Sequence, residues 1–498
     1  KLMPACATPI RDGMVVRTDT ERVQQAVRYA MEFLLLHHPI DCPVCDQSGE
    51  CWLQDYYMEH GEHDSRFPVG EKTRRMKAFD LGPTVKLDQE RCILCTRCVR
   101  FTRDITKTDE LQVFGRGHKS KIDVYQNKPL DNPYSINVVD ICPVGSLTSA
   151  DFRFKVRSWF LKGTPSICGG CSTGCNLRID HSARPQGGGT PGYSATDGIV
   201  YRTVGRRNTE VNRSWLCDEG RLSFHTLEKW PRLTEAKIEN AVSTVEEALQ
   251  QAHTRFEAIR EVHGEEALAA LGTAISTNEA LFLMKKYFRG HVDFRLADET
   301  ALYEVQQDDM LRRQDKHPNT RGALDLGLDT ILGGLDGLLK RAEEKTVRGV
   351  WIAFHPQLVD MDSEEIADKF RRIIESVEFS VVSTPHDFEW AHKASILLPM
   401  AAWSEETGTY TNYAGRVQIA NCGIKTKGSI WPLHRLMASM LELAGETVGH
   451  DPAEIFEAIA RDLPLYAELD YETIGPLGAL PASRLGSGAE KLTEEVMG

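Results

Sequence analysis

Apolar residues recur at helical spacing near the start of the chain. Between residues 23 and 34, five apolar side chains repeat with a helical period, which predicts an amphipathic helix. The letters TDTE before it predict a capping box that joins Thr18 to Glu21. Pro39 predicts the end of this helix, because proline cannot continue the hydrogen-bond ladder. A loop rich in histidine and cysteine follows directly.

The second half of the chain alternates between helical and strand patterns. Amphipathic helices are predicted at 243–264, 276–290 (capped by Ser276 or Thr277), 362–377 and 431–446. Short apolar strands are predicted at 267–274, 291–298, 348–355 and 378–385. This alternation predicts a parallel sheet with helices on both faces. The polar segment 303–330 predicts an irregular loop, and the tail 478–498 predicts a poorly ordered end.

Length, charge and hydropathy narrow the classes of protein to consider. A chain of 498 residues is too long for one core, so two or more domains are expected. The net charge of −13 argues against nucleic acid as a main partner. Apolar runs such as 395–403 are too short to span a bilayer, and no signal peptide pattern is present. Any membrane link is therefore expected to come through a partner.

The cysteines are strongly clustered. Twelve of the thirteen fall within the first 217 residues, and the remainder of the chain holds only Cys422, which is predicted to be a core residue. Disulfide scaffolds are usually short, secreted chains, and this chain is long and shows no secretory signal. Clustered cysteines in this setting indicate metal ligands.

The first group has the spacing H-x3-C-x2-C-x5-C and consists of His38, Cys42, Cys45 and Cys51. His38 is preferred over His37 because it stands at the helix end, next to the loop that carries the cysteines. Three cysteines and one histidine suit an iron–sulfur cluster, and they also suit a structural zinc ion.

The second group combines the run Cys92, Cys95 and Cys98 with the remote Cys142, which precedes a proline. This C-x2-C-x2-C spacing with a distant Cys-Pro is typical of a bacterial ferredoxin [4Fe–4S] site. Four arginines flank the run: Arg91, Arg97, Arg100 and Arg103. They either offset the negative charge of a cluster and raise its potential, or are solvated surface residues.

The third group consists of Cys168, Cys171, Cys175 and Cys217, in a glycine-rich setting that permits close turns around sulfur. Its spacing predicts a [4Fe–4S] cluster, with zinc as the alternative. Cys6 stands alone. It is either a buried apolar thiol or the last ligand of a site whose other ligands lie upstream of Lys1, on a chain expected to be truncated at its amino end.

Other catalytic chemistry has little support in the sequence. No nucleophile–base pair and no G-x-x-x-x-G-K-[ST] motif is found. One G-x-G-x-x-G occurs at 185–192 but follows no strand pattern, so it is interpreted as a flexible turn. Glu405 and Glu406 are interpreted as loop carboxylates rather than catalytic acids. Several clusters in series instead predict transfer of single electrons, because cluster potentials can be tuned over a wide range.

These motifs, in this order, resemble the large iron–sulfur subunit of bacterial respiratory complex I, the 75-kDa subunit family of NADH:quinone oxidoreductase. The matching segments in the first 160 residues are CATPIRDGM at 6–14, HPIDCPVCDQSGEC at 38–51, RCILCTRCVRF at 91–101 and DICPVGSLT at 140–148. The segments ICGGCSTGCNL at 167–177, WLCDEGR at 215–221 and LPMAAWSEETGTYTNYAGRVQ at 398–418 resemble molybdopterin oxidoreductases.

The resemblance implies a multidomain chain, α+β and then α/β. Ferredoxin-like iron–sulfur domains would be followed by a reduced molybdopterin-oxidoreductase-like domain. The implied divisions are 1–20 (end of a plant-type [2Fe–2S] domain), 21–75 (histidine-ligated [4Fe–4S]), 76–160 (ferredoxin-like [4Fe–4S]), 161–225 (the third [4Fe–4S]) and 226–498 (the α/β domain). The resemblance also implies that Cys6 is a [2Fe–2S] ligand, and no molybdenum is expected.

The implied function is electron relay from a flavin subunit that oxidises NADH towards quinone-reducing partners. The chain would have no active site of its own, and it would lie peripherally on the cytoplasmic face of the inner membrane, attached through other peripheral-arm subunits. Two redox alternatives stay open. One is a molybdenum or tungsten formate dehydrogenase catalytic subunit, and the other is the diaphorase iron–sulfur subunit of an NAD-linked hydrogenase. A zinc scaffold without redox activity is a further alternative.

Overall fold

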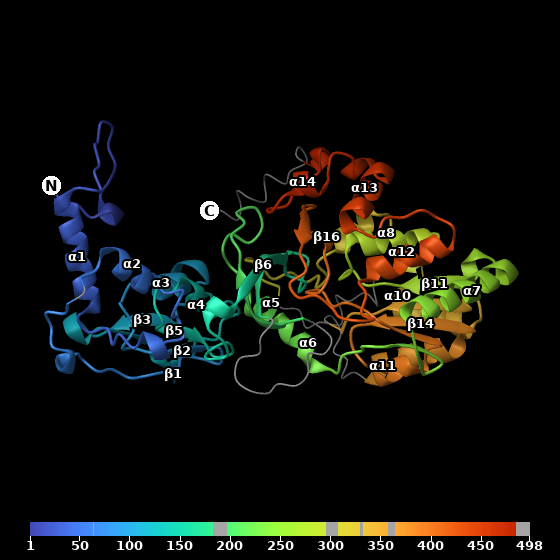
Figure 1. The fold of residues 1–498 in the computed structure, drawn as a ribbon, viewed down its shortest axis with the longest axis horizontal. Helices are drawn as coiled ribbons and strands as arrows, with labels where there is room; N and C mark the ends of the chain where they lie inside the picture. Colours follow the sequence, from blue (N-terminus) through green and yellow to red (C-terminus); the bar gives the residue numbers. More distant parts are fainter. Residues whose placement is uncertain (63, 183–196, 295–306, 329–331, 357–363, 485–498) are drawn as a thin grey trace. The chain divides into compact units, whose positions relative to one another are not determined.

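The computed structural model describes residues 1–62, 64–182, 197–294, 307–328, 332–356 and 364–484. The chain divides into two compact units, Lys1–Leu161 and Lys162–Gly498 (Figure 1). The finer domain divisions expected at 20, 75 and 225 stay predictions. The motif expected to be a turn at 185–192 lies outside the described residues.

The first unit begins with the predicted helix, α1 (Glu21–Leu35), followed by α2 (Trp52–His60). The predicted capping residue, Thr18, was wrong. Thr20 is the N-cap, and its side chain accepts a hydrogen bond from the Val23 backbone. Both threonines in TDTE suit this role, and the helix begins at the later one. Met31 of α1, Leu53 of α2 and Val144 share a small core, so α1 and α2 pack together beside the Cys142 segment.

Short strands and helical turns hold the remainder of the first unit. An antiparallel sheet has the order β1-β2-β5, and a separate hairpin joins β3 to β4. The strands are β1 (Phe79–Asp80), β2 (Val85–Leu87), β3 (Leu111–Phe114), β4 (Lys121–Val124) and β5 (Leu147–Ser149). The helices are α3 (Arg97–Arg100), which runs into a π-helical turn at Phe101–Ile105, and α4 (Asn137–Ile141). Loops and short helical turns therefore make up most of this unit and carry its cysteines.

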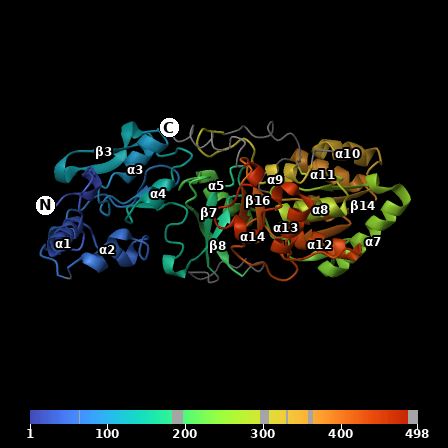
Figure 2. The same cartoon turned by 90° about the horizontal axis from the view of Figure 1, so that it is seen from above.

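The second unit opens with an antiparallel sheet in the order β6-β7-β8, which the sequence pattern did not predict. Its strands are β6 (Lys162–Ile167), β7 (Asn176–Ser182) and β8 (Ile199–Gly205). The short helices α5 (Asp218–Leu222) and α6 (Thr226–Lys229) follow. Figure 2 shows β7, β8 and α5 gathered in one region.

A seven-stranded sheet, ordered β10-β9-β15-β14-β13-β11-β12, forms the centre of the second unit. Its strands are β9 (Ala236–Ile238), β10 (Ala241–Ser243), β11 (Leu268–Leu271), β12 (Val292–Asp293), β13 (Gly349–Ala353), β14 (Phe379–Thr384) and β15 (Ile396–Pro399). Strands β11 to β15 pair in parallel, which confirms the parallel sheet, whereas β9 and β10 add an antiparallel edge. The parallel strands β11 to β15 are buried because helices cover both faces.

Right-handed crossovers assign the helices to the two faces. The connection from β11 through α8 (Asn278–Tyr287) to β12 and the connection from β13 through α11 (Glu364–Ser376) to β14 run in opposite directions along the sheet. Because such crossovers are right-handed, α8 and α11 lie on opposite faces. α7 (Val245–His263) and α12 (Leu433–Leu443) pack with α8, and α10 (Gly334–Glu343) packs with α11.

The predicted helices in this unit are confirmed, with Thr244 as the capping-box residue of α7 and Thr277 as the N-cap of α8. Two expectations need correction. Within 303–330, which was expected to be an irregular loop, residues 320–325 form helix α9 (Thr320–Asp325), and Tyr466 and Arg484 hydrogen-bond to Asp325 at its end. In the tail, Ala479 pairs with Val417, so 478–484 is packed against the unit.

The remaining elements are a hairpin of β16 (Gly408–Thr411) and β17 (Val417–Ala420) and the helices α13 (Pro452–Asp462) and α14 (Tyr471–Ile474). Across the described part of the chain, no helix combines the length and the apolarity that crossing a membrane requires.

Candidate metal centres

The two histidines at the end of α1 have different surroundings. The exposed His37 ring accepts a hydrogen bond from the Thr73 backbone at 3.2 Å and packs edge-on against Phe67. The His38 ring is half-buried, and burial lowers its pKa to about 4. A neutral imidazole is the form that binds metal, so these surroundings support His38 as the ligand.

A tight loop presents the three cysteines of the first group. Cys42 opens a single 3-10 turn, Cys42–Val44, and the Cys45 backbone closes it by donating to the Cys42 carbonyl at 3.1 Å. Cys51 then stands as the N-cap of α2, where its backbone leads into the helix. Cys45 and Cys51 are buried, and burial raises the pKa of both thiols.

Backbone turns of unusual geometry shape the second group. Leu94 and Thr96, which alternate with the cysteines, have φ angles of 55° and 59°. This left-handed conformation is uncommon for residues with a side chain, and here it coils the chain tightly through Cys92, Cys95 and Cys98. Cys142 stands at the end of α4, where Pro143 follows and the helix stops. All four cysteines line one cavity, which Leu87, Ile122 and Leu147 close with apolar surface.

The third group lies where β6, β7 and α5 meet. The Cys168 backbone donates to the Cys175 carbonyl at 2.8 Å, which closes the loop on itself. A Cβ built on Gly220 would lie 2.9 Å from the Cys168 sulfur and 3.3 Å from the Cys217 sulfur, so both sulfurs reach the same glycine. All four thiols of this group are buried.

The segment that contains Leu311, Asp315 and Lys316 packs against the third group. The Ser172 backbone donates to the Asp315 carbonyl at 2.8 Å, and the Thr173 hydroxyl donates to the Leu311 carbonyl at 2.6 Å. Lys316 lies in the same segment and pairs with Glu219 at 3.1 Å, beside Cys217. Lys316 therefore brings a positive charge close to the thiols.

The buried thiols indicate what these sets can hold. Burial raises the pKa of Cys98 and Cys168 well above the usual value, and raises that of Cys142 and Cys217 to about 12. Four buried thiolates repel one another, so the ligand form needs cationic metal among them. The donor sets and the cysteine-lined cavity fit [4Fe–4S] clusters, in which each iron takes one outer ligand.

Two further observations concern the ligand predictions. Among the residues that the structure describes, no three His, Cys, Asp or Glu side chains are placed to bind a single metal ion. Cys6 lies exposed in the 3-10 turn Ala5–Ala7. Its assignment to a [2Fe–2S] cluster stays a prediction, as do the three cluster assignments.

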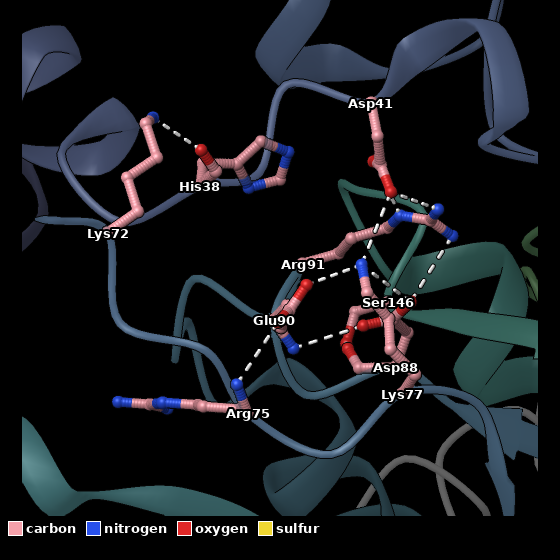
Figure 3. A network of polar contacts seen from close by, with 9 residues as sticks. All are labelled: His38, Asp41, Lys72, Arg75, Lys77, Asp88, Glu90, Arg91 and Ser146. Atoms are coloured by element: carbon pink, nitrogen blue, oxygen red, sulfur yellow. Dashed lines mark hydrogen bonds and ion pairs between the residues drawn. The ribbon is translucent and has the colours of Figure 1, made fainter. Parts of the chain in front are cut away.

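Two residues next to the cysteines were not identified as a pair from the sequence. Arg91 was grouped with three other arginines, yet it is only 4% exposed and forms a two-pronged ion pair with Asp41 (Figure 3). By contrast, Arg100 and Arg103 are exposed, and Arg97 lies over the Trp52 ring. The solvated interpretation holds for Arg100 and Arg103 and fails for Arg91.

A close glycine contact joins the first two groups. A Cβ built on Gly145 would overlap the Cys45 sulfur. The Pro143 carbonyl accepts a hydrogen bond from the Trp52 backbone at 3.1 Å, and the Cys51 sulfur lies 3.8 Å from the same oxygen. The chain after Cys142 therefore packs directly on the loop of the first group.

Glu405 and Glu406 lie in the loop after β15, as expected, but both are buried. Glu405 forms a two-pronged pair with Arg232. Among the described residues, neither carboxyl oxygen of Glu406 has a hydrogen-bond partner. Burial raises the pKa of Glu406 to about 8, and the neighbouring carboxylates of Glu279 and Glu405 contribute to this rise. Glu406 is therefore held in its protonated form.

The buried Glu406 predicts a fall in stability as pH rises. From its usual pKa near 4.5 to about 8 the unfolded chain releases this proton while the folded chain keeps it. Each pH unit in that window costs about 1.4 kcal/mol of unfolding free energy. We expect Glu406→Gln to flatten this decline, as measured by urea unfolding from pH 5 to 9. Glu457→Gln, on an exposed position of α13, should keep the wild-type slope.

Three family models match parts of the chain. The NADH-ubiquinone oxidoreductase-G iron-sulfur binding region matches residues 28–66, which include the first group. The ferredoxin-like domain of NADH-quinone oxidoreductase subunit 3 matches 82–148, which include the second group. The molybdopterin oxidoreductase model matches 319–430. The fold class is thus ferredoxin-like iron–sulfur domains followed by a molybdopterin oxidoreductase domain.

Three curated relatives are named as subunits of NADH-quinone or NADH-ubiquinone oxidoreductase. The G subunit of NADH-quinone oxidoreductase from Rickettsia conorii is 39% identical over 286 residues, or 57% of this chain and 40% of the relative. Its counterpart in Rickettsia bellii is 28% identical over 585 residues, which cover 94% of this chain and 82% of the relative. The mitochondrial 78 kDa subunit of NADH-ubiquinone oxidoreductase from Candida albicans is 37% identical over 314 residues, or 62% and 40%. The first match thus spans about two fifths of that relative. Over these matched segments the chain is similar to the G subunit of NADH-quinone oxidoreductase.

Proposed function

We propose that this chain relays single electrons between partner subunits of NADH:quinone oxidoreductase. The observation that carries the proposal is the packing of the first two ligand sets on each other, with Gly145 of one against Cys45 of the other. Two redox centres that share a packing contact are close enough to exchange electrons. Iron–sulfur clusters supply that chemistry when bound, because they gain or lose one electron with little rearrangement.

The ligand sets would hold three [4Fe–4S] clusters. His38, Cys42, Cys45 and Cys51 form the first set, Cys92, Cys95, Cys98 and Cys142 the second, and Cys168, Cys171, Cys175 and Cys217 the third. Cys45, Cys51, Cys98 and all four cysteines of the third set are buried, which limits the access of water to their sulfurs. His38 replaces one negatively charged thiolate with a neutral imidazole, which favours a higher potential for the first set.

The partners and the location follow from the family rather than from a site on this chain. Electrons would come from the flavin subunit that oxidises NADH and pass to other peripheral-arm subunits towards quinone. The chain itself would carry no independent active site and no molybdenum. It would lie at the cytoplasmic face of the inner membrane through its partner subunits.

Metal analysis of the anaerobically purified chain tests the proposal. We expect about twelve iron atoms and as many acid-labile sulfides, from three cubes of four irons each. Dithionite should bleach the visible absorbance and produce EPR signals of reduced clusters. Zinc in place of iron at the first two sets would contradict electron relay. Stoichiometric molybdenum or tungsten would support the formate dehydrogenase alternative instead.

A further inference from the structure

Arg91 and Asp41 connect the two cluster loops of the first unit. Asp41 directly precedes Cys42 of the first set, and Arg91 directly precedes Cys92 of the second set. The Arg91 Nε and Nη2 atoms donate to the two carboxylate oxygens of Asp41 at 3.0 and 2.7 Å. Fifty residues separate the partners, so the pair fixes one loop against the other. Figure 3 shows the two side chains meeting between their loops.

The guanidinium lies at the loop of the first set. Both oxygens that accept hydrogen bonds from it belong to Asp41, the residue directly before Cys42. The Arg91 side chain therefore reaches from its own loop into the loop of the first set. The positive charge therefore belongs to the first set, although its residue lies beside the second in sequence.

One nitrogen of the Arg91 guanidinium is available to bind a further partner. The Arg91 Nη1 atom is buried and donates no hydrogen bond among the described residues. It lies 3.5 Å from the Asp88 carboxylate, a distance that gives an ion pair without a hydrogen bond. A buried donor without an acceptor is costly, and a negatively charged cluster beside Cys45 would relieve that cost.

The surrounding network holds Arg91 in this orientation. The Asp88 backbone donates to the Ser146 carbonyl at 2.7 Å, and the Ser146 hydroxyl donates to the Asp88 carbonyl at 2.8 Å. Lys77 pairs with Asp41, Asp88 and Glu90, so it ties the same acids together. Because both partners of Arg91 are themselves fixed, the guanidinium has little freedom to turn away.

We propose that Arg91 is a positioning residue for electron relay, which fixes the spacing of the two cluster loops through Asp41 and raises the potential of the His38-set cluster. The inference rests on the proposed function. A fixed positive charge stabilises the reduced, more negative cluster and so raises its midpoint potential. Only a fork of donors can hold both oxygens of Asp41 at once, which lysine cannot reproduce.

Redox titration followed by EPR on the full chain tests this inference. Arg91→Gln is expected to lower the midpoint potential of the His38-set cluster and to shift the Cys92-set cluster less. Arg91→Lys keeps the charge and should shift the potential by a smaller amount in the same direction. Arg103→Gln is the matched control, because Arg103 is exposed and paired with Asp104 in the same unit. It should leave both potentials at the wild-type values.

The outcomes separate the inference from the proposed function. An unchanged potential in Arg91→Gln, or equal shifts of both clusters, would overturn the role of Arg91 while leaving electron relay intact. A wild-type chain without a cluster at the His38 set would overturn both. If Arg91→Gln fails to fold, Arg91→Lys decides instead. Lysine keeps the positive charge but cannot hold both oxygens of Asp41, so the His38-set potential should still fall, and an unchanged potential would contradict the proposal.

Discussion

Replacing Cys98 with alanine is expected to remove about four of about twelve iron atoms, because each cube of four irons needs its full ligand set. Cys98 is buried in the cavity that the other three cysteines of its set line. Loss of this thiol opens one corner of the cube to water in an apolar cavity. Iron and sulfide analysis, with EPR of the reduced chain, measures the loss directly.

The control for this variant is Cys422→Ala. Cys422 is half-buried in the second unit, and its thiol donates to the Glu405 and Ile424 carbonyls rather than lying with other cysteines. Iron content should stay at the wild-type level. Full iron content in Cys98→Ala, or equal losses in both variants, would remove Cys98 from the ligand set.

A methyl group at Gly145 is expected to displace the cluster of the other set. Gly145 follows Cys142 of the second set, but its added Cβ would overlap the sulfur of Cys45 in the first. Close-packed interiors relax only partly around such an overlap, so the Cys45 sulfur has to move away from its ligand position. We expect Gly145→Ala to lose the EPR signal of the His38-set cluster before that of the Cys92 set.

Gly70→Ala provides the matched control in the same unit. A Cβ at Gly70 meets no heavy atom within 4 Å, so this substitution adds the same methyl group into open space. Both cluster signals should survive it. Retention of the His38-set signal in Gly145→Ala would show that the two loops do not constrain each other at this point.

The sequence predicted the local patterns well because periodicity and ligand spacing are local properties. The alternation of apolar strands and amphipathic helices predicted the parallel strands β11 to β14, and the spacing of cysteines grouped Cys92, Cys95, Cys98 and Cys142, which line one cavity. The antiparallel strands β9 and β10 were missed because each has three residues, too few to show a period. The sequence does not distinguish Thr18 from Thr20 as the N-cap, because the choice depends on the residue at which the helix begins.

Contacts between distant segments could not be predicted in this way. Arg91 looks the same in sequence whether it faces water or a carboxylate fifty positions away, so only the fold reveals Asp41 as its partner. Glu406 was interpreted as a loop carboxylate because acidic residues are almost never fully buried without a partner. The structure places it inside the second unit among other acids, a long-range arrangement that local pattern does not encode.

Pro143 and Gly145 pack against the loop that carries Cys45 and Cys51. This contact has a consequence for protein engineering. Neither ligand set of the first unit is structurally independent of the other. A designer who transplants the Cys92–Cys98 segment into a new scaffold has to include the Cys142–Gly145 and Asp41–Cys51 segments with it.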